Sequence, residues 1–476
     1  MVKSVNISYR NQYSMQLPGF IPNIGDAFGQ KTGSVLSPGL DFAFGLTDDS
    51  YIQKALDNGW LLCNDFVATP ANSSKTEDLQ VRATLEPIRD LKIDLSATRT
   101  DTRSKSVQYM YAGTPTTFSG TFTMTTLSLR SALEGMGDAS NGYQSASFDR
   151  FCASIAEYRD RVQAQYPAND KSPVGAANPV DAYSADVLIP AFLNAYTVGA
   201  GGSLDIFPLI TRLLPNWTIR YAGLSKLSWL RDHFKSVNLN HSYKSVYSVG
   251  SFASYSSWLG YSGDLGYVKA ADGSYTPSSM YNISTVSINE LFSPLLGLDV
   301  TFNNNLTVKA EYKTTRQLNL SMTSVQINES RSNDWVIGFG YKISDFNLFG
   351  SGNTSRKIKG AQRNKGKNGQ QDDSKSSSSS SRTTKKGGVN HDLNTRLDIS
   401  FRDQAAITRD IASGVSSASS GNSALRISLS ADYTLSRLLT LSAYYDQQTN
   451  TPLLSASSYP TTTRDFGFAL KFSLTR

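Results

Sequence analysis

The sequence predicts an all-β protein, a transmembrane antiparallel β-barrel segment of about 10–12 long strands with α-helical loop insertions. Three observations predict it: strict alternation of apolar and polar residues, a composition rich in aromatic and small polar residues, and short turns that alternate with longer loops. Of the 476 residues, 39% are hydrophobic and 18% are charged, with 24 Tyr and 22 Phe. This mixture suits β structure with one polar face better than packed layers of helices and strands. No run of 18 apolar residues occurs, so no transmembrane helix is expected.

The alternation is clearest in residues 334–343, which read DWVIGFGYKI. Large apolar or aromatic residues occupy every odd position, and charged residues or glycine occupy most of the even ones. Strict period-2 alternation indicates a strand whose two faces meet different media. The same pattern occurs in the segments 79–86, 91–97, 286–302, 306–322, 393–401, 425–433 and 464–474.

The connections between these segments differ in length. Residues 302–306 and 435–439 form tight turns, whereas longer loops rich in Ser, Asn, Thr and Gly are expected at 253–279, 323–333, 403–423 and 448–463. Short periplasmic turns and longer outer loops are typical of outer-membrane barrels. Counting strands back from a periplasmic C-terminus places both tight turns on the periplasmic side.

Helical periodicity interrupts the strands in three segments: residues 50–62, 147–162 and 184–196. The chain is therefore divided into barrel strands in 1–129 with a helical or irregular insert at 19–76, a helical loop insert at 130–213 that is expected to act as a cap or gate element, barrel strands in 214–344, a Lys/Ser-rich disordered linker at 345–391, and C-terminal barrel strands in 392–476.

The net charge of +7 comes from the linker alone. Residues 351–390 carry ten Lys or Arg and two Asp, a net charge of +8, so the rest of the chain is close to neutral. The basic character therefore predicts no nucleic-acid-binding surface. The N-terminus has no apolar core or cleavage site of a signal peptide, so an exported chain of this kind is expected to be a piece of a longer one.

The residues offer no catalytic or metal-binding pattern. His233, His241 and His391 have neither a serine elbow nor metal-ligand spacing nor a neighbouring carboxylate pair. We expect Cys63 and Cys152 to be two unpaired thiols, and a disulfide between them is the alternative. We expect a protein that is not an enzyme and that has no cofactor.

The two strand faces give two sets of candidate functional residues. Lipid-facing and girdle positions are expected where aromatic residues lie near strand ends and on the apolar faces; ordinary aromatic packing in a soluble β-sandwich is the alternative. These positions are Trp217, Trp335, Ile337, Phe339, Tyr341, Tyr433, Tyr445, Phe468, Leu470 and Phe472. Lumen-facing positions are expected on the polar faces, at Lys309, Glu311, Lys313, Gln317, Arg396 and Asp398.

Several long phrases of the chain also resemble one known family. They include LPNWTIRYAGLSKLSWLRDHFKSVNLNHSYKSVYSVGSF (214–252), residues 286–322, 334–343, 385–404, 429–453 and 458–476, and, upstream, residues 39–61, 81–95 and 184–197. In this order they resemble the C-terminal part of SprA/Sov, the giant outer-membrane translocon of the type IX secretion system in the Bacteroidetes. The resemblance extends over nearly the whole chain.

The resemblance implies a function that the alternation does not. It implies a place in the outer membrane of a Gram-negative bacterium of the Bacteroidetes, in a single-chain barrel of many strands whose wide pore passes folded cargo proteins from periplasm to cell surface and which also supports gliding motility. The implied partners are outer-membrane lipid, a smaller outer-membrane barrel shuttle protein, a periplasmic plug protein, and secreted cargo proteins with C-terminal signal domains. Some ten to twelve strands cannot enclose so wide a pore, so the chain is expected to be part of a much larger barrel.

Three other interpretations stay open at this point. A self-contained small outer-membrane barrel, acting as a porin or adhesin, would close through its own first and last strands. A soluble surface β-protein such as a carbohydrate-binding module would bury its apolar faces between sheets. An outer-membrane hydrolase would need a catalytic pair for which the sequence offers no candidates.

Overall fold

The computed structural model describes residues 1–22, 39–45, 47, 50–62, 69–109, 114–168, 171–199, 201–344, 346, 391–436, 438–454 and 459–473. The Lys/Ser-rich linker expected at 345–391 lies outside the described residues, apart from Phe346 and His391.

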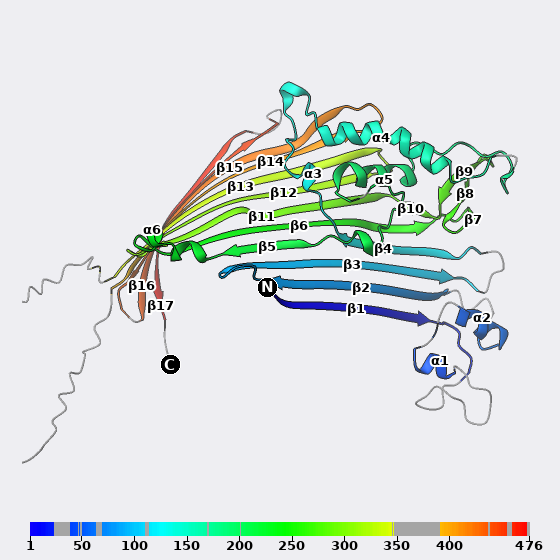
Figure 1. The fold of residues 1–476 in the computed structure, drawn as a ribbon, viewed down its shortest axis with the longest axis horizontal. Helices are drawn as coiled ribbons and strands as arrows, with labels where there is room; N and C mark the ends of the chain where they lie inside the picture. The colour runs from blue at the N-terminus through cyan, green and yellow to red at the C-terminus, as the bar shows by residue number, and fades with distance from the viewer. Residues whose placement is uncertain are drawn as a thin grey trace, which may run out of the picture.

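One antiparallel sheet of 14 strands dominates the described part of the chain (Figure 1). Twelve strands follow a single path in the order β1-β2-β3-β4-β6-β11-β12-β13-β14-β15-β16-β17, which confirms the predicted all-β, antiparallel architecture with about 10–12 long strands. The bounds are β1 (Val2–Gln16), β2 (Ala71–Leu85), β3 (Leu91–Val107), β4 (Thr117–Thr125), β5 (Asn216–Tyr221), β6 (Phe234–Ser254), β10 (Tyr281–Ile283), β11 (Thr285–Phe302), β12 (Leu306–Ser321), β13 (Gln326–Ile343), β14 (Leu393–Asp410), β15 (Ser416–Thr434), β16 (Leu439–Pro452) and β17 (Thr461–Phe472).

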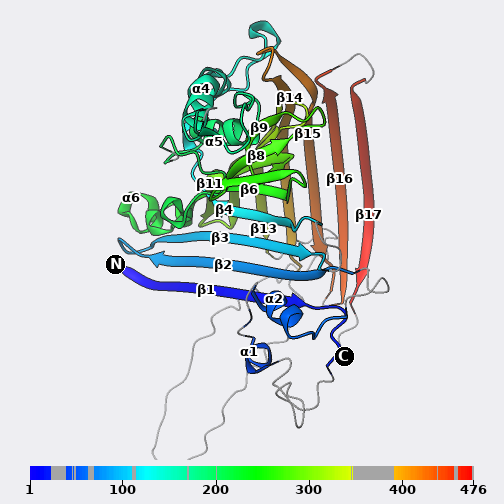
Figure 2. The same ribbon diagram turned by 90° about the vertical axis from the view of Figure 1, so that its right-hand side faces the viewer.

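The sheet twists and curls along this path. β1–β3 and β16–β17 run at a steep angle to one another at its two ends (Figures 1 and 2). Within the described residues, β1 pairs only with β2 and β17 pairs only with β16, so the sheet is open.

The strands are longer than the alternation predicts. β12 and β13 pair without a slip from Leu306↔Tyr341 to Ser321↔Gln326, and β13 continues with β14 as far as Gln326↔Asp410. The prediction of long loops at 323–333 and 403–423 is therefore wrong, because most of these residues belong to strands. Their Ser, Asn and Arg residues hide the period-2 signal, although pairing with neighbouring strands keeps the backbone extended. The turn that joins β12 to β13 is short, so turn length differs less between the two ends of the sheet than expected.

The helical insert joins β4 to β5, two short strands that both lie between β3 and β6 in the sheet. β4 pairs with the upper parts of β3 and β6, and β5 pairs with their lower parts, so the two short strands share one place in the sheet. The chain between them forms α3 (Leu129–Ala132), η1 (Ala139–Asn141), α4 (Ala146–Gln163), α5 (Ala185–Tyr196) and η3 (Ile210–Arg212).

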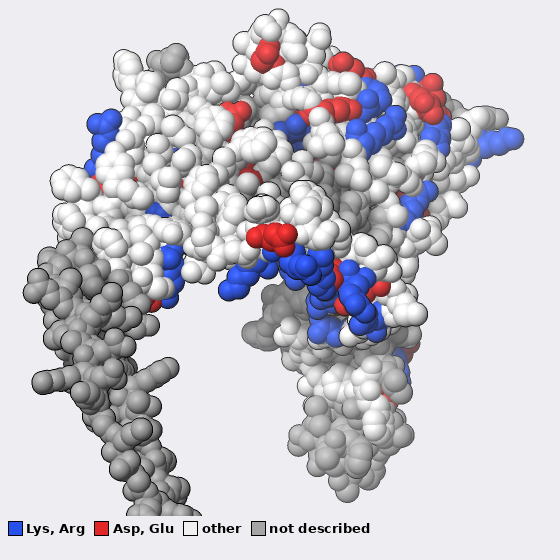
Figure 3. All heavy atoms as spheres, turned by 60° about the vertical axis from the view of Figure 1, so that its left-hand side comes forward, with Lys and Arg blue, Asp and Glu red and all other residues white. Residues whose placement is uncertain are grey.

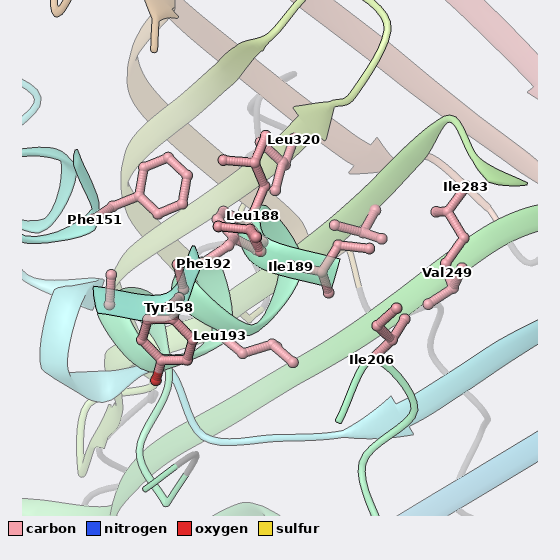
Figure 4. Packing of buried hydrophobic residues seen from close by; sticks show 14 of the residues in the cluster. Phe151, Tyr158, Leu188, Ile189, Phe192, Leu193, Ile206, Val249, Ile283 and Leu320 are labelled. Atoms are coloured by element: carbon pink, nitrogen blue, oxygen red, sulfur yellow. The ribbon is translucent and has the colours of Figure 1, made fainter. Parts of the chain in front are cut away.

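Helix α4 buries the face that its sequence predicts, with Phe148, Phe151, Ile155, Tyr158 and Val162 all turned inward. The Ser145 side chain caps its first turn by accepting a hydrogen bond from the Phe148 N–H. Helix α5 is buried along almost its whole length between α4 and the sheet. Phe151 of α4, Leu188 of α5 and Leu320 of β12 lie together in one core (Figure 4).

Smaller elements lie around this frame. A separate three-stranded sheet, β7 (Trp258–Ser262), β8 (Leu265–Lys269) and β9 (Tyr275–Ser279), follows β6. The N-terminal insert holds α1 (Leu40–Ala43) and α2 (Ser50–Asp57), and β2 begins at Ala71, inside the range expected as insert. Near the opposite end of the sheet, η4 (Gly223–Lys226) and α6 (Ser228–Arg231) precede β6. Among the described residues, no helix is long and apolar enough to cross a membrane.

Candidate functional site

One face of the main sheet carries an apolar band that crosses every strand position. Directly paired residues of an antiparallel sheet share a face, so the register traces the band from strand to strand. One row reads Val237, Val300, Val308, Phe339, Leu397, Leu429, Tyr445 and Phe466. On β1–β3, near the other edge of the sheet, a higher row of the same face reads Ile7, Val81 and Ala97.

The lower part of this band, at the end with the turn 303–305, is bare. We define the bare band as the apolar-face residues of β1, β2, β3, β5, β6 and β11–β17 that lie between this end and the paired row Tyr312–Trp335. Among the band residues that the structure describes on these strands, a single Lys, Arg, Asp or Glu occurs. It is Arg464 of the edge strand β17, in the row of Ile337, and its Nε donates to Gln447 Oε1 over 3.3 Å. Large side chains there are open to the surroundings, with Trp335 at 53% and Leu470 at 64% exposure.

Most residues predicted to face lipid lie in this bare band. Trp335 stacks on Tyr312 with ring centroids 4.3 Å apart, and both belong to its upper row. The exposed set is Trp335, Ile337, Phe339, Tyr341, Phe468, Leu470 and Phe472. Tyr445 shares the face but is half-buried, and its hydroxyl donates to Gln447 Oε1 over 2.7 Å.

Two of the predicted girdle residues are covered. Trp217 stacks on the buried Tyr243, at 4.6 Å between ring centroids, and packs in a cluster with Leu127 and Ala132 of the insert. Tyr433 is buried, with its ring beside His391 and Phe346. Both lie on the apolar face, but neither is open to a surrounding medium, because chain remote in sequence folds over them.

The opposite face is polar, and it carries all six residues predicted to line a lumen. One row reads Asp299, Lys309, Gly338, Asp398, Ser428 and Asp446. Its charges are paired: Glu311 lies 2.8 Å from Lys309 and 2.9 Å from Lys313, and Arg396 lies 2.6 Å from Asp398. Gln317 lies further along β12, where its amide makes a long contact with Asn319.

The polar face is hollowed. Three cavities of about 350, 520 and 610 Å³ follow it across β6 and β11–β15, and neighbouring ones share lining residues such as Asp334 and Asp398. We call these hollows together the trough. Figure 3 shows the molecule hollowed beneath its main body, with Lys and Arg side chains gathered at the edge of that hollow.

The upper part of the apolar face is covered by the helical insert. Leu318, Leu320, Ile327, Val249 and Ile288 are buried there against α4 and α5. The insert at 130–213 was expected as a cap or gate element of a lumen. Its helices α4 and α5 lie against the sheet (Figure 2) and pack on its apolar face, where their own apolar faces find a partner, and the role as a cap or gate stays a prediction.

Charged residues lie buried beneath this insert, and the sequence analysis missed them. Glu329 of β13 accepts from Arg316 Nε of β12 over 2.9 Å and from Arg409 Nε of β14 over 3.0 Å. All three side chains are at most 3% exposed. Each is on the apolar face, at a position where the alternation alone predicts a group that faces lipid.

These arginines hold the insert through its backbone. Arg316 Nη1 donates to the Ser131 carbonyl over 2.7 Å, and Arg409 Nη2 donates to the Met136 carbonyl over 3.1 Å. Arg331 of β13 donates to the Glu134 carbonyl, and Arg409 also donates to the Tyr143 carbonyl. Three adjacent strands thus bind one segment, residues 131–143, which we call the clamped segment.

A second buried carboxylate completes this group. Glu290 Oε1 accepts from Ser128 Oγ over 2.7 Å and from Tyr243 over 2.8 Å, and Glu290 Oε2 lies 4.0 Å from Arg316. The available signal was the break in alternation at Glu290 and Arg316. A charge on an otherwise apolar face predicts a covered, paired site rather than contact with lipid.

Two of the three histidines contact backbone carbonyl groups. His241 Nδ1 lies 2.6 Å from the Leu295 carbonyl, and His391 Nδ1 lies 3.2 Å from the Thr434 carbonyl. Cys152 is half-buried in α4, and burial raises the pKa of its thiol to about 11. Cys63 lies outside the described residues, so the expectation of two unpaired thiols stays a prediction.

Comparisons with known proteins give weak likenesses. No family model matches the sequence, and no curated protein matches it. Among solved structures, OmpT, an outer membrane protein of Vibrio cholerae, in its trimer form is 8% identical, covers 85% of this chain and 94% of its own, and has a TM-score of 0.21. An anion-selective porin from Comamonas acidovorans is 8% identical, covers 80% of this chain and 82% of its own, and has a TM-score of 0.11. TM-scores this low carry no argument about function.

Proposed function

We propose that this chain forms part of the wall of an outer-membrane β-barrel, and that the barrel is a protein-conducting translocon of the SprA/Sov type. The observation that carries the membrane location is the bare band, which is continuous over twelve strand positions and has one charged residue among those described, Arg464 of the edge strand β17. Water-soluble proteins rarely expose so large a contiguous apolar surface. Lipid chains would cover it, and Arg464 lies one row below its upper boundary, where a long side chain can extend to the membrane surface.

The height of the band fits a thin bilayer. On β13 it runs from Trp335 to Ile343, which is roughly 26 Å along the strand at about 3.3 Å per residue. A strand tilt of about 40° reduces this to roughly 20 Å, close to the 25 Å apolar band of outer-membrane barrels. The covered part of the same strands then projects beyond the membrane, where buried charges such as Glu329 are compatible with the surroundings.

The trough supports a conduit rather than a binding site. Its charges lie in ion pairs of both signs, such as Asp334 with Arg402 at 2.7 Å and Asp446 with Arg426. A wall that is hydrated and has no large apolar patch holds a passing protein weakly. This is the property that a pore for folded proteins needs.

The open edges support a larger ring. Each unpaired N–H or C=O group of β1 and β17 would cost several kcal/mol in hydrocarbon, so these edges need partners, and we propose that further strands supply them. Twelve strands at about 4.8 Å spacing and 40° tilt would close to a backbone diameter of roughly 24 Å. A folded domain of 100 residues is roughly 33 Å across, so a barrel for folded cargo needs more strands than these.

The finer proposal rests on the sequence resemblance. The proposed partners are outer-membrane lipid, a smaller outer-membrane barrel shuttle protein, a periplasmic plug protein and secreted proteins with C-terminal signal domains. The location proposed is the outer membrane of a Gram-negative bacterium of the Bacteroidetes. No step of chemistry is assigned to this chain.

The test is to isolate the chain from its own outer membrane after cross-linking and to measure its size with an antibody against DFGFALKFSLTR. A polypeptide several times longer than 476 residues that purifies with a smaller barrel supports the translocon. A heat-modifiable band near 51.9 kDa that is stable alone in detergent would contradict it, and would favour a self-contained barrel acting as a porin or adhesin.

A further inference from the structure

Arginines occur above the bare band on the apolar face in two distant parts of the sheet. Arg99 of β3 is opposite Met124, and the register continues through Tyr247, Ile288 and Leu318 to Glu329 of β13. Arg99 and Arg103 at one side of the sheet and Arg316, Arg331 and Arg409 at the other therefore lie within four successive rows of this face. On β12–β14 the arginines bind the clamped segment, whereas on β3 they line a cavity.

This cavity lies where the insert, β3 and the strands β8–β10 meet. It has a volume of about 490 Å³, within the range of small-molecule sites. Arg99 and Arg103 enter it from the sheet, Ile206 and Phe207 from the insert, and Tyr281 from β10. It is separate from the trough, which lies on the opposite face of the sheet.

The two arginines share one carboxylate. Asp101 Oδ1 accepts from Arg103 Nε over 3.1 Å, and Asp101 Oδ2 accepts from Arg99 Nη2 over 3.3 Å. Arg103 Nη1 also donates to the Tyr281 hydroxyl over 3.2 Å. The Arg99 side chain is only 11% exposed, yet its Nε has no hydrogen-bond partner among the described residues. One donor of a planar guanidinium is thus left for a ligand, beside a second guanidinium.

Acceptors line the rest of the cavity. They are the carboxylates of Asp186, Asp205 and Asp264. Asp186 accepts from the Ser279 N–H over 2.8 Å, and burial raises the pKa of its carboxyl group. A cavity with two arginines and several carboxyl groups suits a ligand that carries one anionic group and several hydroxyls. Guanidinium groups bind phosphate oxygens, and carboxylates accept from hydroxyls.

We propose that this cavity binds a phosphorylated sugar, with the phosphate on Arg99 and Arg103 and the hydroxyls on the aspartates. The ligand has two sources, a free sugar phosphate or the headgroup of a phosphorylated glycolipid. The lipid source rests on the proposed membrane location, because β3 leads from Arg99 through Ala97 and Leu95 on the same face down to Ile93 and Leu91 of the bare band. A headgroup at the membrane boundary could then enter the cavity while its acyl chains cover the band.

The test measures binding to the full chain in detergent and in vesicles. Glucosamine 1-phosphate is the soluble probe and glucosamine is its uncharged counterpart. Vesicles of phosphatidylethanolamine with or without a bis-phosphorylated diglucosamine lipid are the membrane probes. The variants are Arg99→Met/Arg103→Met, the milder Arg103→Lys, and the control Arg396→Met, which removes an exposed arginine of the trough paired with Asp398.

We expect glucosamine 1-phosphate to bind the native chain and the control equally. Binding should weaken about tenfold or more in the double variant and less in Arg103→Lys, which keeps the charge but loses the planar fork. The milder variant serves if the double variant does not fold. Preferential binding of the phosphorylated vesicles, lost in the same variants, supports the headgroup as the source.

The other outcomes separate the two proposals. Soluble binding that needs the arginines, without any vesicle preference, supports a site for a free sugar phosphate and overturns the lipid source. A chain that binds the soluble probe but does not enter vesicles overturns the membrane location and leaves the site standing. Absence of binding to the native chain, or equal binding to native chain and double variant, overturns the site.

Discussion

The lower and upper parts of the apolar face differ in one respect: the lower part is bare and the upper part is covered by its own chain. Below the row of Trp335, side chains such as Phe339 and Leu470 are exposed, and Arg464 at the edge strand β17 is the one described band residue that is charged. Above it, Leu320 and Ile327 are fully buried, and Arg316, Glu329 and Arg409 lie among them. The difference teaches that alternation marks an apolar face without saying whether lipid or protein covers it.

Charge separates the two cases. An unpaired charge in hydrocarbon costs several kcal/mol, whereas a charge under a protein cover can be paired and hydrogen-bonded. Arg316 and Arg409 meet both Glu329 and the carbonyls of the clamped segment. A face that carries such groups has to stay covered, so we regard the insert as a fixed part of the wall and not as a lid.

The largest effect is expected for Glu329→Leu, which removes the carboxylate between Arg316 and Arg409. Two buried guanidinium groups would lose their shared partner, and breaking a buried pair in this way costs about 3–5 kcal/mol. Limited proteolysis should then cut the insert between α4 and α5 much faster, while the bare band keeps its membrane insertion. Unchanged protease resistance would contradict the view that this pairing holds the insert.

The second prediction concerns the bare band and uses two neighbouring residues on opposite faces. Ile337→Lys places a charge in the band and should weaken membrane insertion by about 2–4 kcal/mol. Val336→Lys places the same charge in the trough and should have little effect. Folding into vesicles, followed by heat-modifiable gel mobility, measures both. Equal losses in the two variants would mean that the bare band does not face lipid.

The third prediction reports on the covered part through Cys152. Because burial raises the pKa of its thiol to about 11, from an ordinary value of 9.0, the thiolate is roughly 100-fold scarcer at pH 8. In a Cys63→Ser chain, alkylation should be correspondingly slow and should rise about tenfold per pH unit up to pH 10. Adding Glu329→Leu should speed the alkylation of Cys152 at pH 8. A rate typical of an exposed thiol in the chain without Glu329→Leu would show that the insert is not docked on the apolar face.

The smallest effect is expected in the trough. Asp398→Asn removes the partner of Arg396, whose side chain is 69% exposed. Exposed ion pairs contribute about 0–1 kcal/mol, so denaturant unfolding should change by less than this. A loss as large as that of Glu329→Leu would mean that the trough is as dry as the covered face, which would contradict a hydrated conduit.

Much of the fold could be predicted from the sequence because strand alternation is a local signal. The odd positions of β13 from Trp335 to Tyr341 share one face, as the pattern indicates, and α4 buries the predicted face from Phe148 to Val162. Strand ends were harder to predict. Residues 326–333 and 403–410 extend β13 and β14, although both segments are polar, because their pairing partners rather than their own periodicity keep them extended.

The sequence by itself determined the two-faced strands, the helices and the charge of each face, because these depend on spacing along the chain. Only the tertiary structure decided which parts of the apolar face are covered. Trp217 and Trp335 look alike in sequence, yet one lies under the insert and the other is open. The insert leaves the sheet between β4 and β5 and packs against β12–β14, which are more than a hundred residues away in the sequence. Such contacts depend on distance in space, which no local pattern encodes.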